Sequence, residues 1–263
     1  IGGIEAAFYW IPLNTLFTRF AQTKAMAKQM SHFFVLPEAA GLFAPLLGGF
    51  VAVLLGFPAL FIFSFLVNIG AVAFLSNLAQ EKTHFQFSLT CFKQIWHRNK
   101  TYFVSEFFNH ISEETAGIIF PVVAYLSLLS ITGIGAIGTL ISLGMIIVTL
   151  AIGQFADRYD KRNMLRLGAV LLMGTWLLAF WTQSAIWFYA ISILLGFFLR
   201  FFLIPYNALL YANAKTDDAQ FLVLRESSVV SARIFVFLLA IFFAARLEFV
   251  FLAAALALVY FFF

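Results

Sequence analysis

The chain has 263 residues, of which 63% are hydrophobic and only 11% are charged, and its mean hydropathy is +0.98. These values exclude an ordinary water-soluble domain, in which about half of the residues are apolar. The 36 Phe residues lie in long apolar runs rather than in alternation, which excludes an outer-membrane barrel and leaves a polytopic, all-α membrane protein. With one cysteine, Cys91, and no Cys/His cluster at ligand spacing, we expect no internal disulfide, no metal site and no cofactor.

Nine apolar stretches are long enough to cross a bilayer core, which takes roughly 20 residues. They lie near 1–20, 33–55, 57–78, 102–129, 133–155, 164–181, 185–212, 223–245 and 249–263. Short turns at 56–58 and 182–184 join some of them, whereas the alternate connections are longer and hold nearly all of the basic residues. By the positive-inside rule these basic loops face the cytoplasm, so the net charge of +4 reflects topology rather than nucleic-acid binding.

The longest connection, Gln80 to Lys100, places Phe85, Leu89, Phe92 and Trp96 at helical spacing. This pattern predicts an amphipathic helix on the cytoplasmic surface of the membrane. Three spans precede the connection and six follow it. Because the chain begins at Ile1 inside apolar sequence and ends at Phe263 without a polar tail, we expect it to be a fragment of a longer membrane protein.

A charged motif joins the fifth expected span to the sixth. The segment 153–162, GQFADRYDKR, resembles the G-x-x-x-D-R/K-x-G-R/K-R/K loop of the major facilitator superfamily, and it matches at Gly153, Asp157, Arg158, Lys161 and Arg162. It departs from the family pattern at Asp160, which stands where the second glycine is expected. The resemblance implies a gating role, in which Asp157 favours the positive N-terminus of the helix that begins near residue 33. Its basic neighbours would then hold acidic groups or lipid phosphates.

A second, shorter motif agrees with this register. The segment 44–49, APLLGG, is similar to the G-P-x-x-G-G end of the fifth-span motif of the superfamily, with Ala44 in place of the first glycine. The resemblance implies that nine of a probable twelve spans are present. Residues 1–79 would then be the last three spans of the N-terminal bundle, residues 80–101 the cytoplasmic central loop with its amphipathic helix, and residues 102–263 the C-terminal six-helix bundle.

A polar stripe marks the expected span 102–129. Glu106, Asn109, His110 and Glu113 share one helical face, and Glu114 lies beside it. Ionisable groups at membrane depth are costly and usually face a cavity or a partner, so the stripe is a candidate coupling and substrate site. Glu106 is nearer the cytoplasmic surface, and we expect it to be solvated.

Arg200 lies at the same depth as Glu113, because each is about 17–18 Å from the cytoplasmic end of its span at 1.5 Å per residue. We therefore expect an ion pair between Arg200 and Glu113 or Glu114, with Asn207 continuing the Arg200 face. Because two carboxyl groups, Glu113 and Glu114, accompany the one guanidinium of Arg200, one carboxyl group is left without a cation partner. Such a desolvated acid beside a like charge favours its neutral form and is a candidate carrier of a coupling proton. A purely structural ion pair stays open as the alternative.

Together these features predict a secondary active transporter of a small organic solute in the plasma (inner) membrane. It would work by alternating access and by proton-coupled efflux, with the solute, protons or another coupling ion, and membrane lipids as partners. Two alternatives stay open. One is a membrane-embedded enzyme for lipid or prenyl substrates, in which Asp157 and Asp160 would face Asp217 and Asp218 across a bound magnesium ion. The other is a scaffold or receptor that does not transport.

Overall fold

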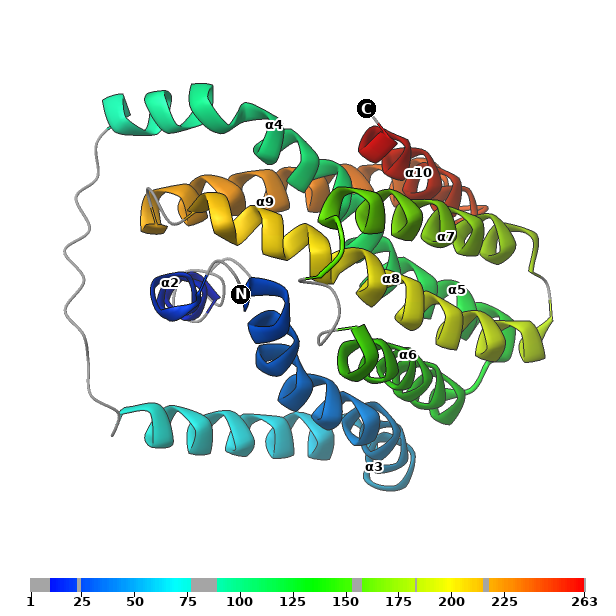
Figure 1. Ribbon diagram of the computed structural model, residues 1–263. Coiled ribbons are helices and arrows are strands. Elements are labelled where there is room, and N and C mark those ends of the chain that lie inside the picture. Colours follow the sequence, from blue (N-terminus) through cyan, green and yellow to red (C-terminus); the bar gives the residue numbers. More distant parts are fainter. Residues whose placement is uncertain are drawn as a thin grey trace.

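The structure, a computed structural model, describes residues 10–22, 25–76, 89–152, 158–182, 184–214 and 218–262. All regular structure in these residues is helical (Figure 1). The helices are α2 (Ile11–Phe20), α3 (Met26–Ser76), α4 (Leu89–Glu114), the π-helix η3 (Thr115–Ile119), α5 (Phe120–Leu128), α6 (Ile131–Ile152), α7 (Lys161–Trp181), α8 (Ala185–Ala214), α9 (Asp218–Phe242), α10 (Phe249–Ala257) and the 3₁₀-helix η4 (Leu258–Phe262).

Five helical segments of the described chain are long and apolar enough to cross a membrane. They are Met26–Ala73, Phe92–Leu128, Ile131–Ile152, Lys161–Trp181 and Ile186–Ala212, and a shorter apolar helix covers Phe249–Phe262. The polytopic all-α class predicted from the sequence is thereby confirmed, whereas the number of nine spans stays a prediction. α3 alone covers two expected spans, and α9 contains three charged residues in the region that the sequence marked as a span.

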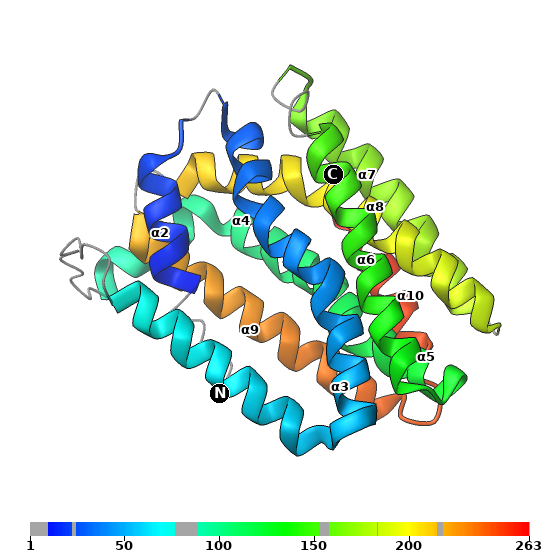
Figure 2. The same ribbon diagram turned by 90° about the horizontal axis from the view of Figure 1, so that it is seen from below.

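The turn expected at residues 56–58 is present inside α3. Gly56 has φ 80° and ψ 167°, a backbone conformation that glycine tolerates and other residues rarely adopt. Pro58 follows it, and the helix changes direction at this point, so that its two parts form a V (Figure 2). The first part packs along α6, while the side chains of residues 61–73 in the second part are exposed.

The segment Ala44–Gly49 lies where α3 crosses α6. A Cβ atom added to Gly135 of α6 would lie 2.6 Å from the carbonyl oxygen of Pro45, and one added to Gly138 would lie 2.7 Å from the Pro45 ring. Small residues are therefore required on the α6 side of this crossing, as in other membrane helix pairs. This contact attaches α3 to the helices that follow the long connection.

α6 and α8 approach each other more closely still. A Cβ atom on Gly144 would lie 2.3 Å from the carbonyl oxygen of Ile193, and one on Gly196 would lie 1.9 Å from that of Ile141. Real Cβ atoms do not come this close to backbone oxygens. The two glycines thus fix the distance between the two helices, and α8 is the helix that holds Arg200.

An aromatic cluster fills the space between α5, α7, α8 and α10. Phe120, Trp176, Phe188 and Phe251 are all fully or almost fully buried, and the rings of Trp176 and Phe251 stack at 5.5 Å. The indole nitrogen of Trp176 donates a hydrogen bond of 2.8 Å to Ser112 Oγ on α4. This bond fixes the position of α4 along its own axis relative to the aromatic cluster. It thereby also positions the polar side chains that α4 carries.

α4 bends at Asn99, whose φ of −116° and ψ of 17° depart from helical values. The helical part before the bend falls within the amphipathic helix expected for 80–100; the earlier residues of that expectation, Phe85 among them, lie outside the described residues. Ile95 rather than Trp96 is the buried side chain of this part. Trp96 stacks on Phe103 across the bend, with ring centroids 5.3 Å apart, and this contact stabilises the angle between the two parts.

Candidate functional site

A cavity of about 680 Å³ lies between α2 and α3 on one side and α4, α6, α8 and α9 on the other. Its volume is in the range typical of small-molecule sites. The wall combines apolar side chains with six charged residues, three acids and three arginines. The cavity lining includes Trp10, Asn14, Phe34, His110, Glu113, Glu114, Gly117, Pro121, Arg200, Asn207, Tyr211, Arg225, Glu226 and Arg233.

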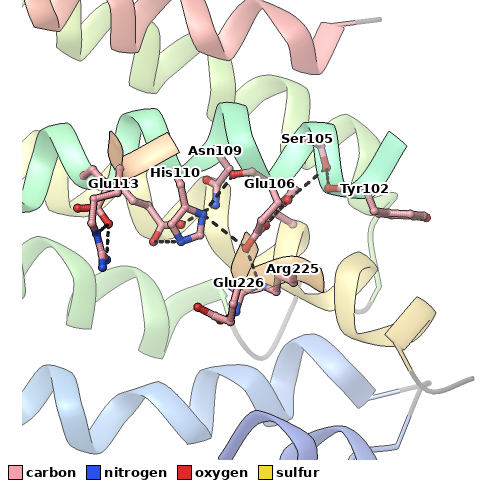
Figure 3. A network of polar contacts seen from close by, with 11 residues as sticks. Tyr102, Ser105, Glu106, Asn109, His110, Glu113, Arg225 and Glu226 are labelled. Atoms are coloured by element: carbon pink, nitrogen blue, oxygen red, sulfur yellow. Dashed lines mark hydrogen bonds and ion pairs between the residues drawn. The ribbon is translucent and has the colours of Figure 1, made fainter. Parts of the chain in front are cut away.

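Glu106 is fully buried, so the expectation that it would be solvated was wrong. Its Oε1 accepts a hydrogen bond of 2.5 Å from Arg225 Nε on α9, and its Oε2 accepts one from the hydroxyl of Tyr206 on α8. Tyr206 in turn lies 3.2 Å from the hydroxyl of Ser105. Three helices thus meet at one carboxylate (Figure 3), and a charge buried in this way is stable because it is both paired and hydrogen-bonded.

A row of polar side chains continues from Glu106 along α4 (Figure 3). His110 Nδ1 lies 3.5 Å from Glu106 Oε1, and His110 Nε2 lies 3.8 Å from Glu113 Oε2. The amide of Asn109 donates a hydrogen bond of 2.6 Å to Glu113 Oε1. The predicted common face of these residues is therefore present, and His110 bridges two carboxylates that are seven residues apart.

The ion pairs differ from the one that the sequence predicted. Arg200 pairs with Glu38 of α3 rather than with Glu113 or Glu114, and its guanidinium also lies 4.3 Å from the centre of the Phe34 ring. Glu114 accepts hydrogen bonds of 2.8 and 2.6 Å from Nε and Nη2 of Arg233 on α9. The sequence places Arg200 and Glu113 at equal depth, but depth along the membrane normal does not fix which helices are neighbours. α3 and α9 supply the partners instead.

The candidate cavity residues can now be placed. His110, Glu113, Glu114, Arg200 and Asn207 all line the cavity, and Asn109 lies behind Glu113 as its hydrogen-bond donor. The structure adds four charged residues that the prediction did not include, namely Glu38, Arg225, Glu226 and Arg233. Glu38 had a visible signal, because it is the one charged residue in the apolar stretch 33–55. Arg225, Glu226 and Arg233 give a weaker signal at the start of the apolar stretch 223–245, because basic residues at the cytoplasmic end of a span also follow from topology alone.

The π-helix η3 follows the acidic pair directly. A π-helix forms i→i+5 bonds and therefore has a wider turn than an α-helix, and such segments occur often at functional sites. Gly117 within this wide turn and Pro121 after it line the same cavity as Glu113. The wide turn thus keeps one face of α4, η3 and α5 directed at the cavity for longer than a regular 3.6-residue repeat would.

Residues 153–157 lie outside the described residues, and with them two of the five predicted gating residues, Gly153 and Asp157. Arg158 and Arg162 are exposed and Lys161 is half-buried at the start of α7. Asp160, which replaces the expected glycine, is the N-cap of α7, and its Oδ1 accepts a hydrogen bond of 2.9 Å from the backbone N–H of Arg162. Its φ is −65°, so the backbone here does not require a glycine.

The described part of the chain holds no group of three or more His, Cys, Asp or Glu side chains that could bind a metal ion. The chemistry of the cavity is therefore that of paired charges, one histidine and several hydrogen-bonding groups in an apolar wall. Such a wall can bind a solute or hold a proton.

Comparison with known proteins agrees with this architecture. The sequence model of the Major Facilitator Superfamily matches residues 102–263, which is more than half of the chain. The chain belongs to the major facilitator superfamily. A search of curated proteins and a search of solved structures each found no significant match.

Membership in the major facilitator superfamily makes the chain an integral, multi-pass membrane transporter of a small solute. In α/β enzymes and in transporters alike, function is decided by the site and not by the fold alone. The superfamily therefore leaves the solute and the coupling ion to be argued from the side chains that line the cavity.

Proposed function

We propose that the protein exports a small organic solute from the cell across the plasma (inner) membrane by alternating access, in exchange for protons that Glu113 carries. The domain division given by the sequence supports this proposal. The cavity lies between elements before the long connection and elements after it, as a site between two bundles requires.

The observation that carries the proposal is the pairing of the acids. Glu38, Glu106, Glu114 and Glu226 each lie within 4 Å of a guanidinium. Glu113 contacts Asn109 and His110 instead, and among the described residues no arginine or lysine nitrogen lies within 4 Å of it, although its charge acts on Arg200 and Arg225 at longer range. A carboxylate without a permanent cation partner is the group best able to exchange a proton, because neither of its states is locked by an ion pair.

His110 gives Glu113 a route for that proton. Its Nε2 lies 3.8 Å from Glu113 Oε2, and its Nδ1 lies 3.2 Å from the backbone carbonyl oxygen of Glu106 and 3.5 Å from Glu106 Oε1. A small movement of the Glu113 side chain would bring its carboxylate into hydrogen-bond distance of Nε2. Since Glu106 is held by Arg225 and Tyr206, we assign the transported proton to Glu113 rather than to Glu106.

Flux measurements test the proposal. The protein is reconstituted in vesicles that contain a pH-sensitive dye, and candidate solutes are added in turn. We expect proton movement that depends on the solute and that is lost in Glu113→Gln. Glu248→Gln is the matched control, because Glu248 lies outside the cavity near Arg246. Solute uptake with unchanged proton movement in Glu113→Gln would contradict the role of Glu113.

The two alternatives left open by the sequence have a test in the same experiment. An enzyme for lipid or prenyl substrates would release a new product from the vesicle lipids, and a scaffold or receptor would move no solute at all. The acidic pair proposed for magnesium gains no support from the structure, since Asp160 is engaged as the N-cap of α7.

A further inference from the structure

The charges in and around the cavity bear on which class of solute it binds. We propose that the cavity selects an amphipathic organic cation, whose positive group binds the carboxylate of Glu113, with Glu226 as the second negative group. This inference rests on the proposed function and adds a substrate class to it.

Each arginine of the cavity is neutralised by an acid. Arg200 pairs with Glu38 and Arg225 pairs with Glu106, and neither of these two acids lines the cavity itself. Arg233 pairs with Glu114 in the wall. Each of the three guanidinium groups thus has a carboxylate partner, two of them behind the surface of the cavity, and this pairing lowers the net positive charge that an anionic solute would meet.

Two acids exceed this balance. Five carboxylates, Glu38, Glu106, Glu113, Glu114 and Glu226, accompany three arginines among the described residues in and around the cavity. Glu226 lies 3.3 Å from Arg225 Nη1, but that guanidinium already donates from Nε to Glu106 at 2.5 Å. Even with a protonated His110, the described wall and its ion-pair partners keep a negative charge.

The two acids in excess of the three arginines, Glu113 and Glu226, are also more exposed than the buried acids. The side chain of Glu113 is 31% exposed and that of Glu226 is 17% exposed, whereas Glu38 and Glu106 are buried. A charge in a water-poor cavity acts strongly on a ligand of opposite sign, because little solvent screens it. The side chain of Arg233 is more exposed still, at 40%, but its guanidinium lies 2.6 Å from Glu114, so the exposed charge without an arginine or lysine within 4 Å, among the described residues, is that of Glu113.

The remaining wall suits a cation that is otherwise apolar. Aromatic rings of Trp10, Phe34 and Tyr211 face the cavity, and such faces attract cations. Arg200 shows this preference within the protein, since its guanidinium lies over the Phe34 ring. Apolar side chains complete the wall, among them Leu199, Leu203 and Val229. A small, strongly hydrated cation would gain nothing from these contacts.

Two probe ions of equal shape and opposite charge test the inference on the wild-type protein. Radiolabelled tetraphenylphosphonium and tetraphenylborate are measured by equilibrium dialysis against purified protein in a neutral detergent, with empty micelles subtracted. We expect the phosphonium to bind at least tenfold more tightly than the borate. Equal binding of the two ions, tighter binding of the borate, or no binding of either would overturn the inference.

A variant pair assigns the effect to the named carboxylate. Glu113→Gln should weaken phosphonium binding about tenfold and leave borate binding unchanged or stronger, whereas the control Glu248→Gln should leave both within twofold. Unchanged phosphonium binding by a folded Glu113→Gln variant would overturn the assignment. Proton flux driven by a neutral or anionic solute, without preference for the phosphonium, would leave the proposed transport standing and defeat the cation inference alone.

Discussion

The buried contact between Glu106 and Arg225 makes the sharpest prediction about stability. Glu106→Ala removes one partner of a buried ion pair and leaves the Arg225 guanidinium without its 2.5 Å contact. Breaking such a pair costs about 3–5 kcal/mol. The variant also strands the hydroxyl of Tyr206, which is buried and donates to the same carboxylate. We therefore expect the free energy of unfolding to fall by about 3–5 kcal/mol.

The measurement is reversible unfolding by SDS in mixed micelles, followed by the fluorescence of the buried Trp176 and its neighbours. Glu248→Ala is the control, since this carboxylate lies 3.5 Å from Arg246 with both side chains exposed. An exposed pair of this kind contributes about 0–1 kcal/mol. The comparison thus separates burial from charge removal in general.

A double-mutant cycle with Arg225→Met completes the test. If the pair acts as a unit, the double variant should recover most of the stability lost in Glu106→Ala, because no buried guanidinium is left without its carboxylate and Glu226 loses only a contact of 3.3 Å to Arg225. A loss of less than about 1 kcal/mol in Glu106→Ala, or additive effects of the two substitutions, would refute the reasoning from buried pairing.

Two further predictions concern packing and capping. Gly196→Ala should destabilise the protein by at least about 1–3 kcal/mol, because its Cβ would lie 1.9 Å from the Ile141 carbonyl oxygen; Gly174→Ala, with nothing within 4 Å, should be neutral or stabilising by up to ~1 kcal/mol. The same unfolding assay checks this, and equal effects of both substitutions would contradict the close approach of α6 and α8. Asp160→Ala should lower stability by about 0.5–2 kcal/mol through the loss of the N-cap of α7. Asp160→Ser should restore most of that loss, and no effect of either substitution would show that the cap is dispensable.

Much of the fold follows from apolar segment lengths. The helices α6, α7 and α8 fall close to the stretches that the sequence marked near 133–155, 164–181 and 185–212. The ends of these helices depend on local residues that can be read from the sequence, such as Asp160, the N-cap of α7. The common face of Glu106, His110 and Glu113 could also be predicted, because helical spacing places side chains on a face whatever the neighbours are.

The pairing of charges could not be predicted in the same way. Arg200 and Glu114 each have a partner on another helix, namely Glu38 and Arg233, and a single sequence holds no information on which helices touch. The burial of Glu106 was missed for the same reason. Its distance from the expected membrane surface suggested water, while Arg225 and Tyr206, more than 90 residues later in the chain, supply the contacts that make burial possible.

The rod formed by α4, η3 and α5 has two interruptions, the bend at Asn99 and the wide turn at Thr115–Ile119. Between them lies one uninterrupted helical piece, and it holds Glu106, His110 and Glu113 together. Because these side chains stand on one rigid helical piece, a rotation of that piece that displaced Glu113 would also displace Glu106 relative to Arg225 of α9. A change at the cavity would therefore also act on the ion pair between α4 and α9.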